Sequence, residues 1–162
     1  MTQNIVVSLL GNAVLGLIFT SAIYLTVNKA EFNSVVNLAI LILLLIASIS
    51  IMIHINTSRL VFYPSYIAVK GLIWSYDIDR SNVIDIEIVN ELSDQKQPKY
   101  RSNGLSFFGY KTGKFKLKSG KSAFFLTNKS QHYAIITLNK SKYDMVIVSI
   151  DKQNIVNLIN KS

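Results

Sequence analysis

Charged residues are almost absent from the first third of this chain. Between residues 1 and 55 only Lys29 and Glu31 are charged, and they separate two long uncharged stretches. An apolar helix of about 20 residues crosses a bilayer core of about 30 Å. Residues 5–27 and 35–55 meet this length, and the short segment between them allows only a tight connection. The sequence therefore predicts a transmembrane hairpin of two helices within residues 1–57.

Three other interpretations of these stretches fit the sequence less well. A cleaved signal peptide carries basic residues before its apolar core, and residues 1–4 contain none. A buried soluble hairpin has a polar stripe, and an interfacial helix has Lys or Arg along one face. Neither stretch shows these features. Two membrane-spanning helices remain the favoured interpretation, and the signal peptide is kept as an alternative.

The orientation in the membrane depends on few residues. Lys29 lies in the connection, whereas Arg59 and Lys70 follow the second stretch. Positive residues near the ends of a span favour the cytoplasmic side. We therefore expect a multi-pass protein of the cell membrane with both chain ends in the cytoplasm.

Small and weakly polar residues recur on one face of the first stretch. Such residues let membrane helices approach closely and form hydrogen bonds between them. If the chain folds back near residue 30, Asn12 reaches the depth of Ser48. No Asp, Glu, Lys or Arg lies inside either stretch, which argues against an ion or proton pathway. The candidates for helix–helix packing are Ser8, Asn12, Gly16, Thr20 and Ser48.

Residues 58–162 form the second predicted domain and carry the net charge of +8. Apolar and polar residues alternate here with a period of two, which is typical of half-buried strands. The polar residues 91–105 are expected to form a loop, and residues 151–161 change to helical spacing. We expect an α+β fold in which a meander of about seven antiparallel strands forms a barrel or sandwich, closed by the C-terminal helix. The expected strands are 59–63, 66–69, 72–78, 83–89, 113–118, 122–126, 131–137 and 144–150.

A set of residues between about 100 and 155 is similar to a known pattern. The set is Arg101-Ser102-Asn103-Gly104, Gly109-Tyr110, Gly113, Phe115, Gly120, Ala123, Tyr143, and Asp151 before a short helix. It resembles the bacterial pleckstrin-homology (PH-like) domains, which often follow one or two transmembrane helices. The resemblance implies two curved, roughly orthogonal sheets with the C-terminal helix closing one open end. It does not imply an enzyme.

Motifs that carry catalysis are missing from the sequence. The chain has no cysteine, no glycine-rich phosphate-binding loop and no metalloprotease or nucleophile-elbow motif. Its two histidines, His54 and His132, form no metal site without carboxylates. Paired carboxylates on one strand face can act as acid and base, but on exposed strands they more often oppose aggregation. We expect no catalytic residue, metal, cofactor or small-molecule substrate. The paired carboxylates are Asp77 with Asp79 and Asp85 with Glu87.

Five lysines lie close together in the sequence. In a strand over residues 113–118, three lysines point to one face, and Phe115 and Leu117 point to the other. Facing an anionic membrane leaflet, each lysine contributes about 1 kcal/mol; the alternative is a solvated strand that keeps the domain soluble. The candidate lipid or anion contacts are Lys111, Lys114, Lys116, Lys118 and Lys121, and the candidate partner contacts are Arg101, Asn103, Phe107 and Phe108.

These observations leave three hypotheses for function. The first is a non-enzymatic module for protein–protein interaction or self-assembly at the cytoplasmic membrane surface, with itself or another membrane protein as partner. The second is a sensor of anionic membrane lipids in envelope stress or antimicrobial-peptide tolerance. The third is an enzyme of unrecognised type built on the carboxylate pairs. Nucleic-acid binding is disfavoured because no aromatic RNA-binding motif accompanies the basic charge.

Overall fold

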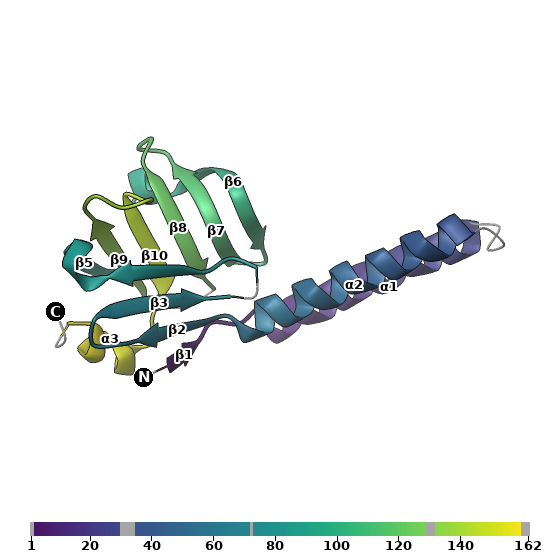
Figure 1. Ribbon diagram of the computed structural model, residues 1–162, viewed down its shortest axis with the longest axis horizontal. Coiled ribbons are helices and arrows are strands. Elements are labelled where there is room, and N and C mark those ends of the chain that lie inside the picture. The colour runs from purple at the N-terminus through teal and green to yellow at the C-terminus, as the bar shows by residue number, and fades with distance from the viewer. Residues whose placement is uncertain (1, 30–34, 72, 129–131, 160–162) are drawn as a thin grey trace.

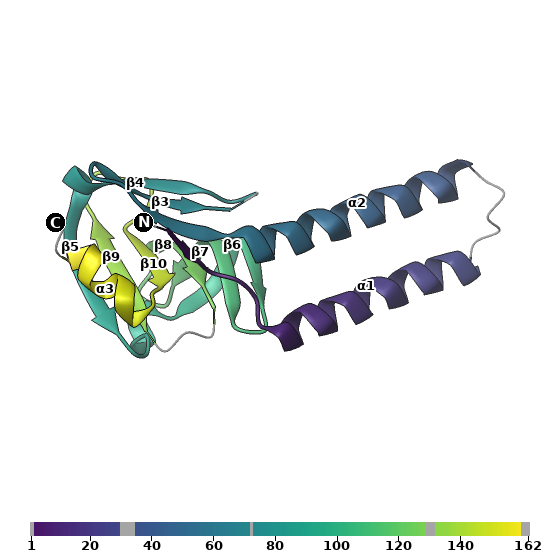
Figure 2. The same ribbon diagram turned by 90° about the horizontal axis from the view of Figure 1, so that it is seen from below.

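The computed structural model describes residues 2–29, 35–71, 73–128 and 132–159. A pair of long helices projects from one side of a two-sheet β domain (Figures 1 and 2). The long helices are α1 (Leu9–Lys29) and α2 (Val35–Thr57), and a short helix, α3 (Lys152–Ile159), lies on the side of the domain away from them. The strands are β1 (Thr2–Asn4), β2 (Arg59–Phe62), β3 (Tyr66–Lys70), β4 (Tyr76–Asp79), β5 (Val83–Val89), β6 (Pro98–Phe107), β7 (Tyr110–Leu117), β8 (Ser122–Thr127), β9 (Tyr133–Leu138) and β10 (Met145–Ser149).

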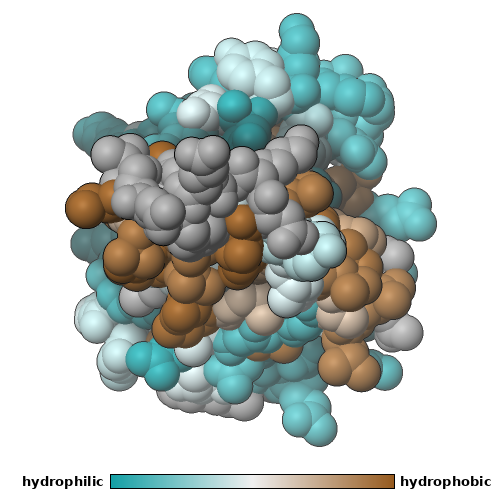
Figure 3. Space-filling model, turned by 90° about the vertical axis from the view of Figure 1, so that its right-hand side faces the viewer, coloured by the Kyte–Doolittle hydropathy of each residue, from teal (hydrophilic) through white to brown (hydrophobic). Residues whose placement is uncertain are grey.

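Both long helices are long and apolar enough to cross a membrane. They run side by side, and little of their surface is covered by the rest of the molecule (Figure 2). Viewed from the side on which the helices project, one group of hydrophobic residues lies left of and below the centre and a second lies near the right edge, with hydrophilic residues mainly above and below them (Figure 3). This exposure distinguishes the pair from the core helices of a soluble protein, which bury their apolar side chains.

The first helix begins later than the sequence predicts. It starts at Leu9 rather than at residue 5, because Ile5 and Val7 are buried in the core of the β domain. Ser8 caps this helix, since its Oγ accepts a hydrogen bond of 3.2 Å from the backbone N–H of Gly11. The apolar residues at positions 5–7 thus belong to a different environment from those that follow them.

Strand β1 extends the β domain to residues that precede the helices. It pairs antiparallel with β2, so that Thr2 lies opposite Val61 and Asn4 opposite Arg59. The β domain therefore contains residues from both sides of the helix pair, whereas a boundary at residue 58 leaves out the N-terminal strand.

The strands form two sheets. One has the order β1-β2-β3-β4, and the other has the order β5-β9-β10-β8-β7-β6. All neighbours are antiparallel except β8 and β10, which are parallel because β10 lies between β8 and β9. The expected antiparallel meander of about seven strands is therefore wrong: the described residues form ten strands with one parallel pair. Alternation of apolar and polar residues predicts that a segment is a strand, but it does not determine which strands lie next to it in the sheet.

Two further expectations differ from the structure. The segment expected to be a loop, residues 91–105, contains a short 3-10 helix (Asp94–Lys96) and most of β6. Five consecutive exposed residues of β6 hide the usual alternation, because this strand lies at the sheet edge. The strand expected over residues 72–78 is only Tyr76–Asp79, and Leu72 lies outside the described residues, as does Gln131 of another expected strand.

The main hydrophobic core lies between the sheets. It joins residues of the four-stranded sheet, such as Leu60 and Ile67, to residues of the six-stranded sheet, such as Val146. A second cluster around Phe125 covers the other face of the six-stranded sheet under Val89 and Leu92. The expected C-terminal helix is present as Lys152–Ile159; Asp151 directly precedes it, and residues 160 and 161 of the predicted range lie outside the described residues.

Candidate functional site

Buried contacts attach the start of α1 and the end of α2 to the β domain. The backbone N–H of Ile5 donates to the carbonyl of Ser58 at 2.8 Å, and that of Val7 donates to the carbonyl of Ile55 at 3.3 Å. The Tyr110 hydroxyl donates to Ser58 Oγ at 2.8 Å. Burial raises the pKa of Tyr110, although its hydrogen bonds oppose this shift. The phenol therefore stays protonated and acts as a donor at the junction.

The residues predicted to pack the helices have separate roles. Asn12 exchanges two side-chain hydrogen bonds of 3.0 Å with Asn56, which places Asn56 rather than Ser48 beside it. Ser48 donates to the carbonyl of Leu44 in its own helix, and Thr20 donates to Gly16. A Cβ atom added at Gly16 would meet nothing within 4 Å. Of the predicted set, only Asn12 makes a side-chain hydrogen bond between the helices in the described residues.

The segment before β4 packs against the end of α2. The backbone N–H of Ile73 donates to His54 Nδ1 at 3.0 Å, and the rings of His54 and Trp74 meet edge to face at 5.2 Å. Glycine is required at position 71, because a Cβ there would lie 2.5 Å from His54 Cε1 and 2.6 Å from the Trp74 carbonyl oxygen. The only tryptophan of the chain is thereby fixed beside the end of a candidate membrane span.

A second contact with the helices comes from the turn between β6 and β7. Phe108 has a φ of 45° and is 48% exposed, and its Cβ would lie 3.4 Å from a Cβ added at Gly11 in α1. Phe107 packs against the main core and contacts the Phe108 ring edge to face. Of the predicted partner-contact residues, Phe108 therefore lies at the helix junction, while Arg101 is exposed on β6.

The five predicted lysines do not form one surface. Lys118 pairs with Asp94 at 2.5 Å, and Lys116 donates to the Gly120 carbonyl at 3.3 Å. Lys111 lines a hollow of about 330 Å³ together with Glu91, whereas Lys114 lines a different cleft. The expected alternation on β7 is present, with Phe115 and Leu117 buried. Lys121 is exposed at the hairpin after β7.

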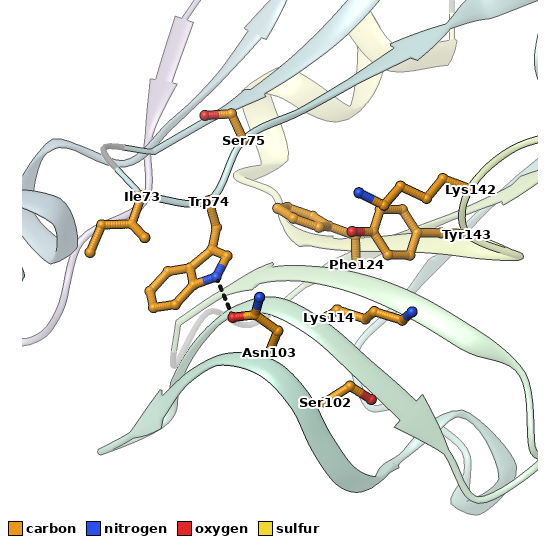
Figure 4. Close-up of a pocket in the computed structure, with 9 residues that line it drawn as sticks. All are labelled: Ile73, Trp74, Ser75, Ser102, Asn103, Lys114, Phe124, Lys142 and Tyr143. Carbon is orange, nitrogen blue, oxygen red and sulfur yellow. Dashed lines mark hydrogen bonds between the residues drawn. The ribbon is translucent and has the colours of Figure 1, made fainter.

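The cleft beside Lys114 has a volume of about 460 Å³ and is drawn in Figure 4. It brings together the segment before β4, strands β6, β7 and β8, and the segment between β9 and β10. Trp74 Nε1 donates to Asn103 Oδ1 at 3.0 Å across one side. The lining residues are Ile73, Trp74, Ser75, Ser102, Asn103, Lys114, Phe124, Lys142 and Tyr143.

Local strand geometry positions Asn103 and Lys114 in this cleft. The two residues lie opposite each other in the β6–β7 ladder, next to the pair Gly104 and Gly113. A Cβ at Gly104 would lie 2.2 Å from the Thr112 carbonyl oxygen, and Gly113 has a φ of 99°. The two glycines therefore let the strands approach closely at the point where they form the cleft wall.

Three of the four carboxylates singled out from the sequence make structural contacts, and the fourth, Asp85, is exposed on β5. Asp77 pairs with Lys70 at 2.7 Å, and Glu87 pairs with Lys96. Asp79 accepts from the backbone and side chain of Ser81, and these hydrogen bonds lower its pKa. No group of three metal-binding His, Asp or Glu residues occurs within the described ranges. His132 lies beside Asn90, with its Nδ1 at 2.8 Å from Asn90 Oδ1.

Sequence reasoning missed Trp74 and Lys142 as cleft residues and Asn56 as the partner of Asn12. The isolated Trp74 near Gly71 was the available signal, since a lone tryptophan beside a membrane span often lies at the interface. No feature of the neighbouring sequence indicates Lys142, because its place at the cleft depends on which strands lie next to one another in the sheet.

Comparison with known proteins finds no matching family model, no similar curated protein and no similar solved structure.

Proposed function

We propose that this protein is a membrane-anchored, PH-like module that binds another protein, or a second copy of itself, at the cytoplasmic membrane surface. The observation that carries the proposal is the attachment of both helix ends to one β domain. Ile5, Val7 and Ile55 are buried in the core shared with both sheets, and Tyr110 of β7 donates to Ser58 directly after α2. A domain held in this way keeps one face toward the membrane and offers its other surfaces to a partner.

The exposed edge of β6 is the surface that best suits such a partner. This strand ends the six-stranded sheet on the side from which the helices leave (Figure 1). Its outer edge pairs with no other strand in the described part of the chain. An exposed edge can accept a further strand through backbone hydrogen bonds. Tyr100, which is 56% exposed, adds an aromatic side chain of the kind enriched at interfaces.

A non-enzymatic role is supported by the engagement of the charged groups. Asp77, Asp79 and Glu87 are held in ion pairs or turns. Such groups stabilise the fold and are not poised toward a substrate.

Photo-crosslinking in membranes tests the proposal. A photoreactive amino acid replaces Tyr100 on β6, and a matched control replaces the exposed Asp85 on β5, at the opposite end of the same sheet. We expect a discrete protein adduct or a dimer from position 100 and none from position 85. Equal, diffuse or absent labelling at the two positions would contradict a partner at β6.

A second candidate function is the sensing of the lipid surface. Ile73 and Phe108 are 52% and 48% exposed beside the ends of α2 and α1, where they can enter the membrane interface. Loss of binding of the Ile73→Ser, Phe108→Ser variant to anionic vesicles, measured with helices in place, would favour this candidate. Unchanged binding would leave the protein-binding module as the only proposal.

A further inference from the structure

The cleft beside Trp74 is lined by hydrogen-bond donors and by no carboxylate. None of its lining residues is Asp or Glu. Lys114 and Lys142 approach it from β7 and from the segment after β9 (Figure 4). Asn103 uses its carbonyl oxygen to accept from Trp74, which leaves its amide nitrogen as a further donor. Ser102 and Tyr143 add hydroxyl groups at the walls.

The two lysines are not neutralised by the protein. Among the described residues, the ion pairs involve Lys70, Lys96 and Lys118 but neither cleft lysine. Lys142 Nζ instead lies 5.6 Å from the centre of the Tyr143 ring, a cation–π contact that leaves its ammonium N–H groups able to bind an anion. Two unpaired cations at one cleft attract negative charge, and an oxyanion can accept hydrogen bonds from both.

Packed aromatic rings form the inner wall of this cleft. The Tyr143 ring packs against Phe124 with ring centres 5.5 Å apart and against Tyr76 at 4.8 Å. The Tyr76 hydroxyl bonds to Ser141, the residue before Lys142. These contacts hold the segment between β9 and β10 in place, so that the lysine it carries is positioned before any ligand arrives.

The cleft also lies close to the helix junction. Its rim residues Ile73 and Trp74 contact His54 in the last turn of α2. A ligand in the cleft would therefore lie near the level of lipid headgroups if α2 crosses a bilayer.

We propose that this cleft binds an oxyanion, with a phosphate group as the ligand chemistry, held by Lys114, Lys142 and the amide of Asn103. The phosphate can come from an anionic lipid headgroup or from a soluble phosphate compound. This inference does not rest on the protein-binding module, because it uses side chains of β6 that line the cleft and not the unpaired backbone edge of that strand.

Trp74 provides a direct readout, since it is the only tryptophan in the chain and lines the cleft. The intact protein is placed in phosphatidylcholine nanodiscs, and its fluorescence is followed while sodium phosphate replaces sodium chloride at constant ionic strength. A second arm replaces part of the phosphatidylcholine with phosphatidylglycerol and adds no phosphate. A saturable change in the first arm identifies a soluble source, and a change confined to the second identifies a lipid source.

The variant Lys114→Gln, Lys142→Gln should weaken the response about tenfold or more, because it removes both charged donors. Lys121→Gln is the matched control, since it removes a positive charge from the same hairpin outside the cleft and should keep the response. The single variant Lys142→Gln changes only an exposed side chain, so it should fold even if the double variant does not. Far-ultraviolet circular dichroism verifies that each variant is folded. No saturable response in either arm, or an equal response in the double variant, would overturn the proposal.

Discussion

The helix pair and the β domain use the same apolar residue types in opposite ways. In α2, Leu43 and Ile46 are 66% and 56% exposed, whereas Leu60 and Ile67 in the first sheet are fully buried. A protein surrounded by water alone would gain free energy by burying the helix side chains as well. This difference is the one expected if lipid surrounds the helices and water surrounds the sheets. Residues 5–8 lie where the environment changes, because Ile5 and Val7 are buried in the β core and the helix that follows starts with the exposed Leu9 and Leu10.

The largest expected effect tests the buried side of this comparison. Phe125 is fully buried in the second cluster, with its ring centre 5.0 Å from that of Phe115. Phe125→Ala should lower the free energy of unfolding by about 3–5 kcal/mol, because it leaves a cavity in a packed layer. Thermal unfolding in detergent measures the loss. The half-exposed Phe108→Ala serves as the control, and an equal loss in both variants would refute the distinction between the two sites.

A charge placed on the exposed side should have a somewhat smaller cost. Ile46→Arg puts a charge near the middle of α2, where insertion into a bilayer costs about 2.5–3.5 kcal/mol. We expect less of the protein in the alkali-resistant membrane fraction, while Ile46→Ala remains there. If the arginine variant partitioned like wild type, lipid would not be the solvent of this helix.

Loss of the hydrogen bond between Ser58 and Tyr110, where α2 meets the β domain, should lower the stability by a smaller amount. Ser58→Ala removes the partner of the buried Tyr110 hydroxyl, at a cost of about 1–3 kcal/mol. Tyr110→Phe and the double variant complete a thermodynamic cycle that isolates the pair. Additive losses in that cycle would show that the hydrogen bond does not couple the helix end to the sheet.

The smallest expected effect concerns a surface carboxylate. Asp144 accepts hydrogen bonds from the backbone and hydroxyl of Ser122, which lower its pKa. A lowered pKa stabilises the fold above the unfolded value of about 3.9, and this stability is lost as the pH falls through the folded pKa. Asp144→Asn should cost less than about 1 kcal/mol at pH 7, because the site is solvent-screened. Melting temperatures should converge at acidic pH; a gap that stays constant with pH would contradict this origin.

The sequence predicted the elements whose residues show one regular pattern: long uncharged stretches for the helices and strict alternation for a half-buried strand. The uncharged stretches gave both helices, and the regular alternation over Val83–Val89 gave β5 with its observed bounds. The burial of Ile5 and Val7 in the β core was missed because they are as apolar as the residues of the first long helix that follow, and β1 was missed because its three polar residues show no alternation. Strand β6 was missed because an edge strand exposes both faces and so loses the alternation.

The cleft was only partly accessible from the sequence. Asn103 was singled out as part of the Arg-Ser-Asn-Gly set, and Lys114 as one of five closely spaced lysines. Trp74 and Lys142 are far from them in the chain, and their meeting depends on which strands become neighbours. Long-range pairing of this kind leaves no mark in local composition.

The pairing of β1 with β2 constrains the order of assembly during synthesis. Thr2–Asn4 is synthesised before both helices, whereas its partner Arg59–Phe62 is synthesised after them. The first strand therefore stays unpaired until both helices and β2 have been made. If the helices cross a membrane, both must cross for the two strands to meet, because a single crossing would leave β1 and β2 on opposite sides and the first sheet open at that edge.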